Sequence, residues 1–171
     1  MRVFIGVKTG CEDHLSALQQ ELKELGSGNF TSRTNLHMTL KFLGEVSAAK
    51  NDGICEAISE AQKGTLKLTC EGLQVFGRDI VSVKVGGERD KLSALYDSLE
   101  AALEKRGFEK ETRRFRPHIT LVRKFRPLGA IDVACIPVKP ASFQVNEVIL
   151  FESTREEGKL IYKPLQRYQL I

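Results

Sequence analysis

The sequence predicts an α+β domain built on mainly antiparallel sheets. Segments with strand-like and helix-like apolar spacing follow one another in the order strand, helix, strand, helix, hairpin, helix, strand, hairpin. A doubly wound parallel sheet would instead alternate strand and helix throughout. Gly77, Arg78 and Asp79 predict a turn between two consecutive strands. No linker or low-complexity segment divides the 171 residues.

The first half of the chain predicts two strands and two helices. Residues 2–8 form the first strand, and residues 12–25 a helix with leucines at helical spacing. Gly26, Ser27 and Gly28 predict a loop after this helix. Residues 36–43 form the second strand. A helix over residues 48–62 follows, with Ser47 as its N-cap and Gly64 after its end.

The second half predicts one long helix among strands. Two strands, 65–76 and 80–85, precede a helix over residues 88–106 that has an apolar stripe and is followed by Gly107. Residues 118–123 form the next strand. A loop marked by three prolines leads to two final strands at 142–151 and 160–168.

The composition is that of an ordinary water-soluble protein. It is 42% hydrophobic and 28% charged, with a net charge of +4, which excludes disordered, collagen-like and membrane-spanning classes. We expect a cytoplasmic protein that does not associate with a membrane. The four cysteines form no Cys-x-x-Cys pair, so we expect small buried thiols rather than disulfides or metal ligands.

Two segments of the chain repeat one short pattern. Residues 35–40 (NLHMTL) and 116–121 (RPHITL) each contain His, an apolar residue, Thr and Leu, at the start of a predicted strand. Alternate side chains of a strand share a face. His37 and Thr39 therefore point one way, as do His118 and Thr120. Leu36, Met38, Leu40 and Phe42 are expected on the opposite, apolar face.

This pairing suits phosphoryl transfer. A neutral imidazole can take a proton from an attacking water while a protonated one gives a proton to the leaving oxygen, on opposite sides of the phosphorus. The ordinary pKa of histidine, about 6.5, allows both forms near neutral pH. Hydroxyls such as those of Thr39 and Thr120 can hold the non-bridging oxygens. The chain has only three histidines, which makes a chance repeat of this pattern a poor explanation.

Positive charge gathers around the second motif. Six basic residues fall between Arg113 and Arg126 without an acid among them, and Phe115 and Phe125 are interleaved. Such a segment suits phosphates and stacked bases. We expect Lys41, Phe115, Arg116 and Lys124 to contact RNA. Strict alternation puts Lys41 on the face of His37 but Arg123 opposite His118, so Arg123 needs a bulge to reach the same cleft.

Residues 36–45 (LHMTLKFLGE) and 116–124 (RPHITLVRK) resemble the paired signatures of the two-histidine phosphoesterase superfamily. The chain is most similar to its RNA 2′,3′-cyclic phosphodiesterases, also called 2′-5′ RNA ligases or LigT-like proteins. RVFIGVK at the start, Phe76-Gly77, Gly107-Phe108 and LFEST near the end extend the resemblance over nearly the whole chain.

The resemblance implies a single two-lobed domain over residues 1–171, with two pseudo-symmetric sheets around a central cleft. It implies hydrolysis of RNA 2′,3′-cyclic phosphate ends to 2′-phosphate ends without a metal or nucleotide cofactor, and ATP-independent 2′-5′ ligation in some members. It assigns His37 as acid and His118 as base, with Thr39, Thr120 and Arg123 on the phosphate. The near-equivalent motifs by themselves do not distinguish the two histidines. We expect a monomer acting on RNA such as tRNA fragments.

Three alternatives remain at this stage. The protein could hydrolyse another cyclic or 2′-5′ nucleotide, or it could be a non-catalytic module that binds AMP-like nucleotides. A metallohydrolase is the third, although the sequence has no closely spaced cluster of Asp and His ligands.

Overall fold

The computed structural model describes residues 1–61 and 63–171. Within these residues the chain forms nine strands, three α-helices and two short 3₁₀ helices, η1 (Arg33–Asn35) and η2 (Val133–Cys135). The α-helices are α1 (Glu12–Leu25), α2 (Ala48–Glu60) and α3 (Arg89–Glu104). The strands are β1 (Arg2–Val7), β2 (Gly26–Phe30), β3 (Met38–Glu45), β4 (Leu66–Phe76), β5 (Ile80–Gly87), β6 (His118–Pro127), β7 (Ala141–Val145), β8 (Glu147–Glu156) and β9 (Lys159–Gln169).

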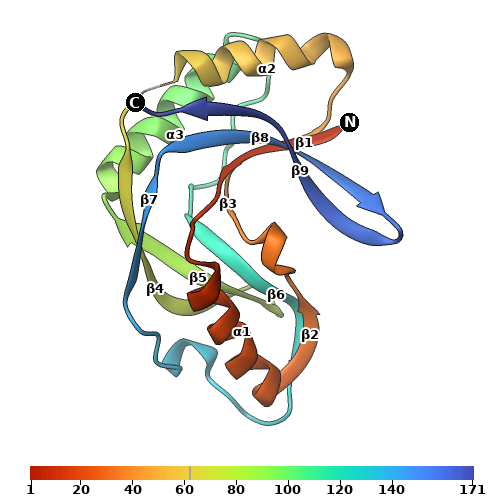
Figure 1. The fold of residues 1–171 in the computed structure, drawn as a ribbon, viewed down its shortest axis with the longest axis vertical. Helices are drawn as coiled ribbons and strands as arrows, with labels where there is room; N and C mark the ends of the chain where they lie inside the picture. The colour runs from red at the N-terminus through yellow and green to blue at the C-terminus, as the bar shows by residue number, and fades with distance from the viewer. Residues whose placement is uncertain (62) are drawn as a thin grey trace.

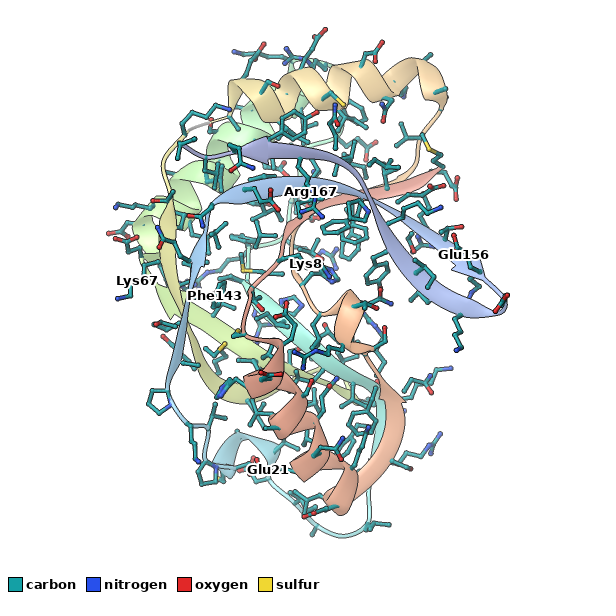
Figure 2. The ribbon with its side chains drawn as sticks, viewed as in Figure 1. Lys8, Glu21, Lys67, Phe143, Glu156 and Arg167 are labelled. Atoms are coloured by element: carbon teal, nitrogen blue, oxygen red, sulfur yellow. The ribbon has the colours of Figure 1, made fainter. Side chains whose placement is uncertain are left out.

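The strands form one curled, antiparallel sheet in the order β7-β4-β5-β6-β3-β1-β8-β9, with β2 added on β6. This confirms the α+β class. The two predicted sheets are joined into a single one. The junction lies between β3 and β6, where Met38 pairs with Ile119. Each side of this junction holds four strands of the main path, which gives the two halves their likeness. The β8–β9 hairpin projects from the body, with Glu156 near its tip (Figure 2).

The helices lie at two ends of the molecule (Figure 1). Helices α2 and α3 pack against each other at the end where both chain termini lie, whereas α1 lies beside β2 at the opposite end. The predicted leucine stripes of α1 and α3 are buried. Among the described residues, no helix is both long and apolar enough to span a membrane.

The loop predicted at residues 26–28 is wrong, because these residues begin strand β2 and pair with β6. Glycine makes the pairing possible. A Cβ on Gly26 would lie 2.4 Å from the carbonyl oxygen of Arg126, and one on Gly28 would lie 2.7 Å from Cγ2 of Val122. The two glycines therefore allow a close approach of backbones, which a sequence pattern cannot distinguish from a turn.

Three further predictions need correction. The single strand predicted over 142–151 is two strands, because the chain turns at Asn146 between β7 and β8. The second helix ends at Glu60, and residue 62 of the predicted range lies outside the described residues. The four cysteines are free, as predicted, but only Cys70 is buried and Cys135 is exposed.

Candidate active site

The two His-x-Thr motifs flank the single residue pair that joins the halves of the sheet. Met38 and Ile119 face each other there, and both are fully buried. Their neighbours in each motif point to the opposite face of the sheet. Since the strands are antiparallel, His37 lies on the side of Thr120, and His118 on the side of Thr39. The two imidazoles therefore approach the site from opposite ends of the pair.

His37 is held by a hydrogen bond that fixes its tautomer. Its Nδ1 lies 2.7 Å from the carbonyl oxygen of Asn35, and its Nε2 lies 2.8 Å from Oγ1 of Thr39. A carbonyl oxygen can only accept, so Nδ1 carries a hydrogen and Nε2 is the nitrogen available for chemistry. Burial lowers the pKa of His37 to about 4, although the Asn35 carbonyl opposes this, and nearby cations add to it.

His118 has the same arrangement in a more open setting. Its Nδ1 lies 2.6 Å from the carbonyl oxygen of Arg116, so Nδ1 again carries a hydrogen and Nε2 is left for the cleft. Its ring lies 4.5 Å from that of Phe76, centroid to centroid. Burial lowers the pKa of His118, and the positive charges of Arg116 and Arg123 lower it further, against the effect of the carbonyl.

A cavity of about 550 Å³ is lined by residues of both motifs, although His37 is not part of its lining in the described part of the chain. Its lining includes His118 and both motif threonines, with Arg123, together with aromatic side chains from several elements: Phe42, Phe76, Tyr96 and Phe115. A second cavity of about 660 Å³ shares Phe42 and Arg123 with the first and extends toward Tyr162 of β9. The ring of Tyr162 lies edge-on to His37 at 5.0 Å. We refer to the two cavities together as the cleft.

Arg123 reaches the cleft because β6 contains a bulge. Thr120 pairs with Ser82 and Val122 with the adjacent Val81, which leaves Leu121 as an extra residue on β6. Leu121 and Val122 are both buried, and the alternation of sides is inverted beyond them. Arg123 is therefore exposed on the face of His118.

The first motif has a bulge at the equivalent position, so Lys41 does not follow the strict alternation that was predicted to place it on the face of His37. Thr39 pairs with Gly6 and Lys41 with the adjacent Ile5, so Leu40 is the extra residue. Lys41 consequently turns inward and its ammonium lies 2.9 Å from the Glu100 carboxylate and 2.8 Å from the Glu109 carbonyl oxygen. Lys41 also lines the His118 cavity, and its contact with RNA stays a prediction. Phe42, expected on the apolar face, is 65% exposed and takes the place of Arg123 in this motif.

The remaining predicted RNA contacts are distributed unevenly. Arg116 and Phe115 line the His118 cavity, and the Arg116 guanidinium lies over the Phe76 ring at 4.4 Å. Lys124 is exposed in a second bulge of β6, at a positive φ of 54°, and does not line that cavity in the described part of the chain. Phe125 is buried in the core instead of being available to a base.

Asn35 is a site residue that sequence reasoning missed. Its carbonyl orients His37, while its buried side chain donates to the Leu160 carbonyl oxygen at 2.8 Å and accepts from the Tyr162 backbone at 3.2 Å. It thereby connects the first motif to β9, 125 residues away in the chain. The available signal was a polar residue directly before an otherwise apolar motif strand.

Comparisons with known proteins place the chain among proteins of one family. A family model described as the 2′-5′ RNA ligase superfamily matches residues 11–157. A relative from Thermotoga maritima named RNA 2′,3′-cyclic phosphodiesterase is 32% identical over 180 residues, covering 99% of this chain and 95% of that protein. A protein of the same name from Methanothermobacter thermautotrophicus is 31% identical and covers 99% of both chains.

Solved structures have the same fold. LigT of Escherichia coli in its apo form superposes with a TM-score of 0.79 at 26% identity, covering 98% of this chain and 96% of that one. The same protein has been solved in complex with 3′-AMP, at the same TM-score and identity, covering 99% and 97%. TT0787 of Thermus thermophilus has a TM-score of 0.80 at 20% identity, covering 99% and 98%, and shows the likeness of fold alone.

Proposed function

The chain belongs to the 2′-5′ RNA ligase superfamily, and from this we propose that it hydrolyses RNA 2′,3′-cyclic phosphate ends to 2′-phosphate ends by a two-histidine mechanism that needs no metal. One observation carries the proposal. Two equivalent His-x-Thr motifs flank a single strand pair, and in each the Nδ1 hydrogen is bound to a carbonyl so that Nε2 is left for the substrate. Relatives about 30% identical are named for this activity.

In the proposed step, water attacks the phosphorus on the side of His118, and its proton passes to Nε2 of that residue. The bond between phosphorus and the 3′ oxygen breaks on the opposite side, where Nε2 of His37 supplies the proton that makes a 3′-hydroxyl. The product carries its phosphate on the 2′ oxygen. The same step with a 5′-hydroxyl in place of water would break the bond between phosphorus and the 3′ oxygen and join two RNA ends through a 2′-5′ linkage without ATP.

This assignment requires His37 to be protonated when substrate is bound. In the free protein its pKa of about 4 leaves it neutral at pH 7. A phosphodiester brings a negative charge next to the imidazole, and a nearby anion raises the pKa of histidine. We propose that the substrate itself thereby promotes protonation of its acid. The hydrogen bond between His37 and Thr39 must be exchanged for contacts with substrate in the same event.

The hydroxyls and Arg123 hold the phosphate in this proposal. Thr39 and Thr120 line the cavity from the two strands, and each can donate to a non-bridging oxygen. Arg123 faces the same cavity and can form a paired, charge-assisted contact. These donors hold the negative charge of the phosphoryl group, while the imidazoles move protons.

The test is incubation with an RNA oligonucleotide that ends in a 2′,3′-cyclic phosphate, in the presence of a chelator. We expect a 2′-phosphate product from the wild type and none from His118→Ala on the same time scale. Loss of turnover in chelator alone would point to a metallohydrolase. If a different cyclic or 2′-5′ nucleotide is hydrolysed in preference to the RNA in direct competition, that nucleotide and not the RNA end is the substrate. Nucleotide binding without turnover of any substrate would indicate a binding module.

A further inference from the structure

A smaller cavity adjoins the one that contains His118. It has a volume of about 240 Å³ and is lined by residues of α3 and of the segment before β6: Arg89, Leu92, Ser93, Tyr96, Asp97, Arg114, Phe115 and Pro117. Tyr96, Arg114 and Phe115 line both cavities. We call the smaller one the side pocket. Its described lining contains no residue of the two His-x-Thr motifs, so it is not part of the reacting centre.

The wall shared by the two cavities is aromatic. The rings of Tyr96 and Phe115 are stacked in parallel, with 4.2 Å between centroids and 3° between planes. Both side chains are only partly buried. Aromatic rings presented in this way stack with any nucleobase, because every base has a π-face. The wall therefore suits a base in the side pocket as well as one beside His118.

The charge around the side pocket suits a phosphodiester. Arg89 and Arg114 are both exposed, and within the described residues neither lies within ion-pair distance of a carboxylate. By contrast, Arg113 is paired with Glu111, and Arg106 with Glu56 and Glu60. Asp97 is the one acid in the lining, which leaves an excess of positive charge. Unpaired cations beside an aromatic wall are the combination found where proteins follow a single strand.

We propose that the side pocket holds the nucleotide that precedes the cyclic-phosphate nucleotide in the RNA. This rests on the proposed function, which puts the terminal cyclic phosphate between His37 and His118. The terminal nucleoside then fills the cavity that contains His118, and its 5′ phosphate lies across the wall that this cavity shares with the side pocket. Arg114 contacts that phosphate, and Arg89 contacts the phosphate on the 5′ side of the preceding nucleotide. The base of the preceding nucleotide stacks on Phe115. The preferred substrate is thus an oligonucleotide end and not a cyclic mononucleotide.

The experiment compares kcat/KM for a 2′,3′-cyclic mononucleotide with that for a dinucleotide that ends in the same cyclic nucleotide and carries a 5′ phosphate, which is the phosphate assigned to Arg89. We expect the wild type to prefer the dinucleotide, and Arg89→Ala to reduce that preference about tenfold while leaving the mononucleotide unchanged. Lys105→Ala is the matched control, because it removes a cation from the other end of α3 and should change neither substrate.

A second pair of variants separates charge from bulk. Ser93 is exposed in the lining, so both Ser93→Glu and Ser93→Gln should fold. Ser93→Glu should weaken turnover of the dinucleotide more than Ser93→Gln, because only glutamate repels a phosphodiester. Equal effects of Arg89→Ala on both substrates, or no preference in the wild type, would overturn the side-pocket assignment. Failure to turn over either substrate would instead contradict the proposed function.

Discussion

In each histidine a hydrogen bond from Nδ1 to a backbone carbonyl two residues earlier in the chain, at Asn35 and at Arg116, leaves Nε2 as the nitrogen that we propose to react. The surroundings of the two rings nevertheless differ. His37 packs among Phe4, Phe151 and Tyr162, whereas His118 contacts Phe76 at the edge of the cleft. The same motif therefore provides one enclosed imidazole and one more accessible one, which suits two different roles in proton transfer.

A change of leaving group tests which histidine is the acid. His37→Ala should slow hydrolysis of the cyclic phosphate by about 100-fold or more, the usual scale for a lost general acid. A nucleoside 2′-phosphate ester of 4-nitrophenol should restore most of that rate, because its leaving oxygen departs without a proton. His118→Ala should remain slow with both substrates. The reverse pattern would exchange the two roles, and equal losses would contradict separate acid and base functions.

The lowered pKa values predict an acid-shifted pH profile. For kcat/KM, which reports the free enzyme, the active form has one neutral and one protonated imidazole, and this form is most abundant between the two pKa values. Both are lowered by burial from 6.5, that of His37 to about 4. The bell-shaped profile should therefore peak below pH 6.5, as measured with a cyclic mononucleotide at constant ionic strength. A maximum at alkaline pH would contradict it.

Most of the residues of the candidate site could be predicted from sequence, because a repeated pattern with two of only three histidines is informative in itself. The side-chain directions beyond each motif could not. Alternation along a strand assumes regular pairing, and one extra residue at Leu40 or Leu121 inverts every position that follows. Lys41 and Phe42 were assigned to the wrong face for this reason, whereas Arg123 was expected in the cleft only if the strand contained such a bulge.

At the scale of elements, the bulge of β6 is supported by its neighbours. The Leu121 carbonyl oxygen accepts from the Gln19 side chain of α1 at 2.9 Å and from the Thr31 backbone at 2.9 Å. On the other side, Gly28 of β2 lies against Val122 and Arg123 so closely that a Cβ would be 2.7 Å from Val122 and 2.9 Å from the Arg123 carbonyl oxygen. β2 thus helps to hold the segment that presents Arg123.

Gly28→Ala should push β2 away from the bulge. We expect a loss of about 1–3 kcal/mol in the free energy of unfolding, the usual cost of overpacking. A rise in KM should accompany it, since Arg123 would be less well placed. Urea unfolding and steady-state kinetics measure both. Gly129→Ala is the control: a Cβ there has no neighbour within 4 Å, so stability and KM should stay close to wild type. Equal behaviour of the two variants would argue against the close approach.

The pairing of β2 with β6 also shows where element prediction fails. Helices α1 and α3 and most strands follow from leucine spacing and apolar runs, because one face of each is buried in the core. The residues Gly-Ser-Gly carry no such pattern. Their role depends on a partner about 100 positions away, and a local pattern contains no information about that partner.

At the scale of the whole molecule, a buried ion pair connects the sheet to the helical layer. Lys41 of β3 and Glu100 of α3 are only 8% and 4% exposed, and Glu100 also accepts from the Glu111 backbone at 3.0 Å. Arg114 and Phe115, which line the cleft, follow closely after Glu111. The pair therefore anchors one wall of the cleft to the strand that carries the first motif.

Removal of one partner should be costly. Lys41→Met leaves the Glu100 carboxylate buried without its cation, and we expect a loss of about 3–5 kcal/mol in the free energy of unfolding. Lys41→Met combined with Glu100→Gln should recover part of that loss. The comparison is Arg113→Ala, whose exposed pair with Glu111 should cost less than about 1 kcal/mol. A small effect of Lys41→Met would mean that Glu100 remains solvated.

The central claim is that His37 and His118 act as one unit on a single phosphorus atom. The most direct test is the single-turnover rate on RNA ending in a 2′,3′-cyclic phosphate, for wild type, His37→Ala, His118→Ala and the double variant. We expect each single variant to lose about 100-fold or more and the double variant to lose little beyond the worse single one, because the effects of residues that act as a unit are not additive. Near-normal turnover in either single variant would show that the two histidines do not act together.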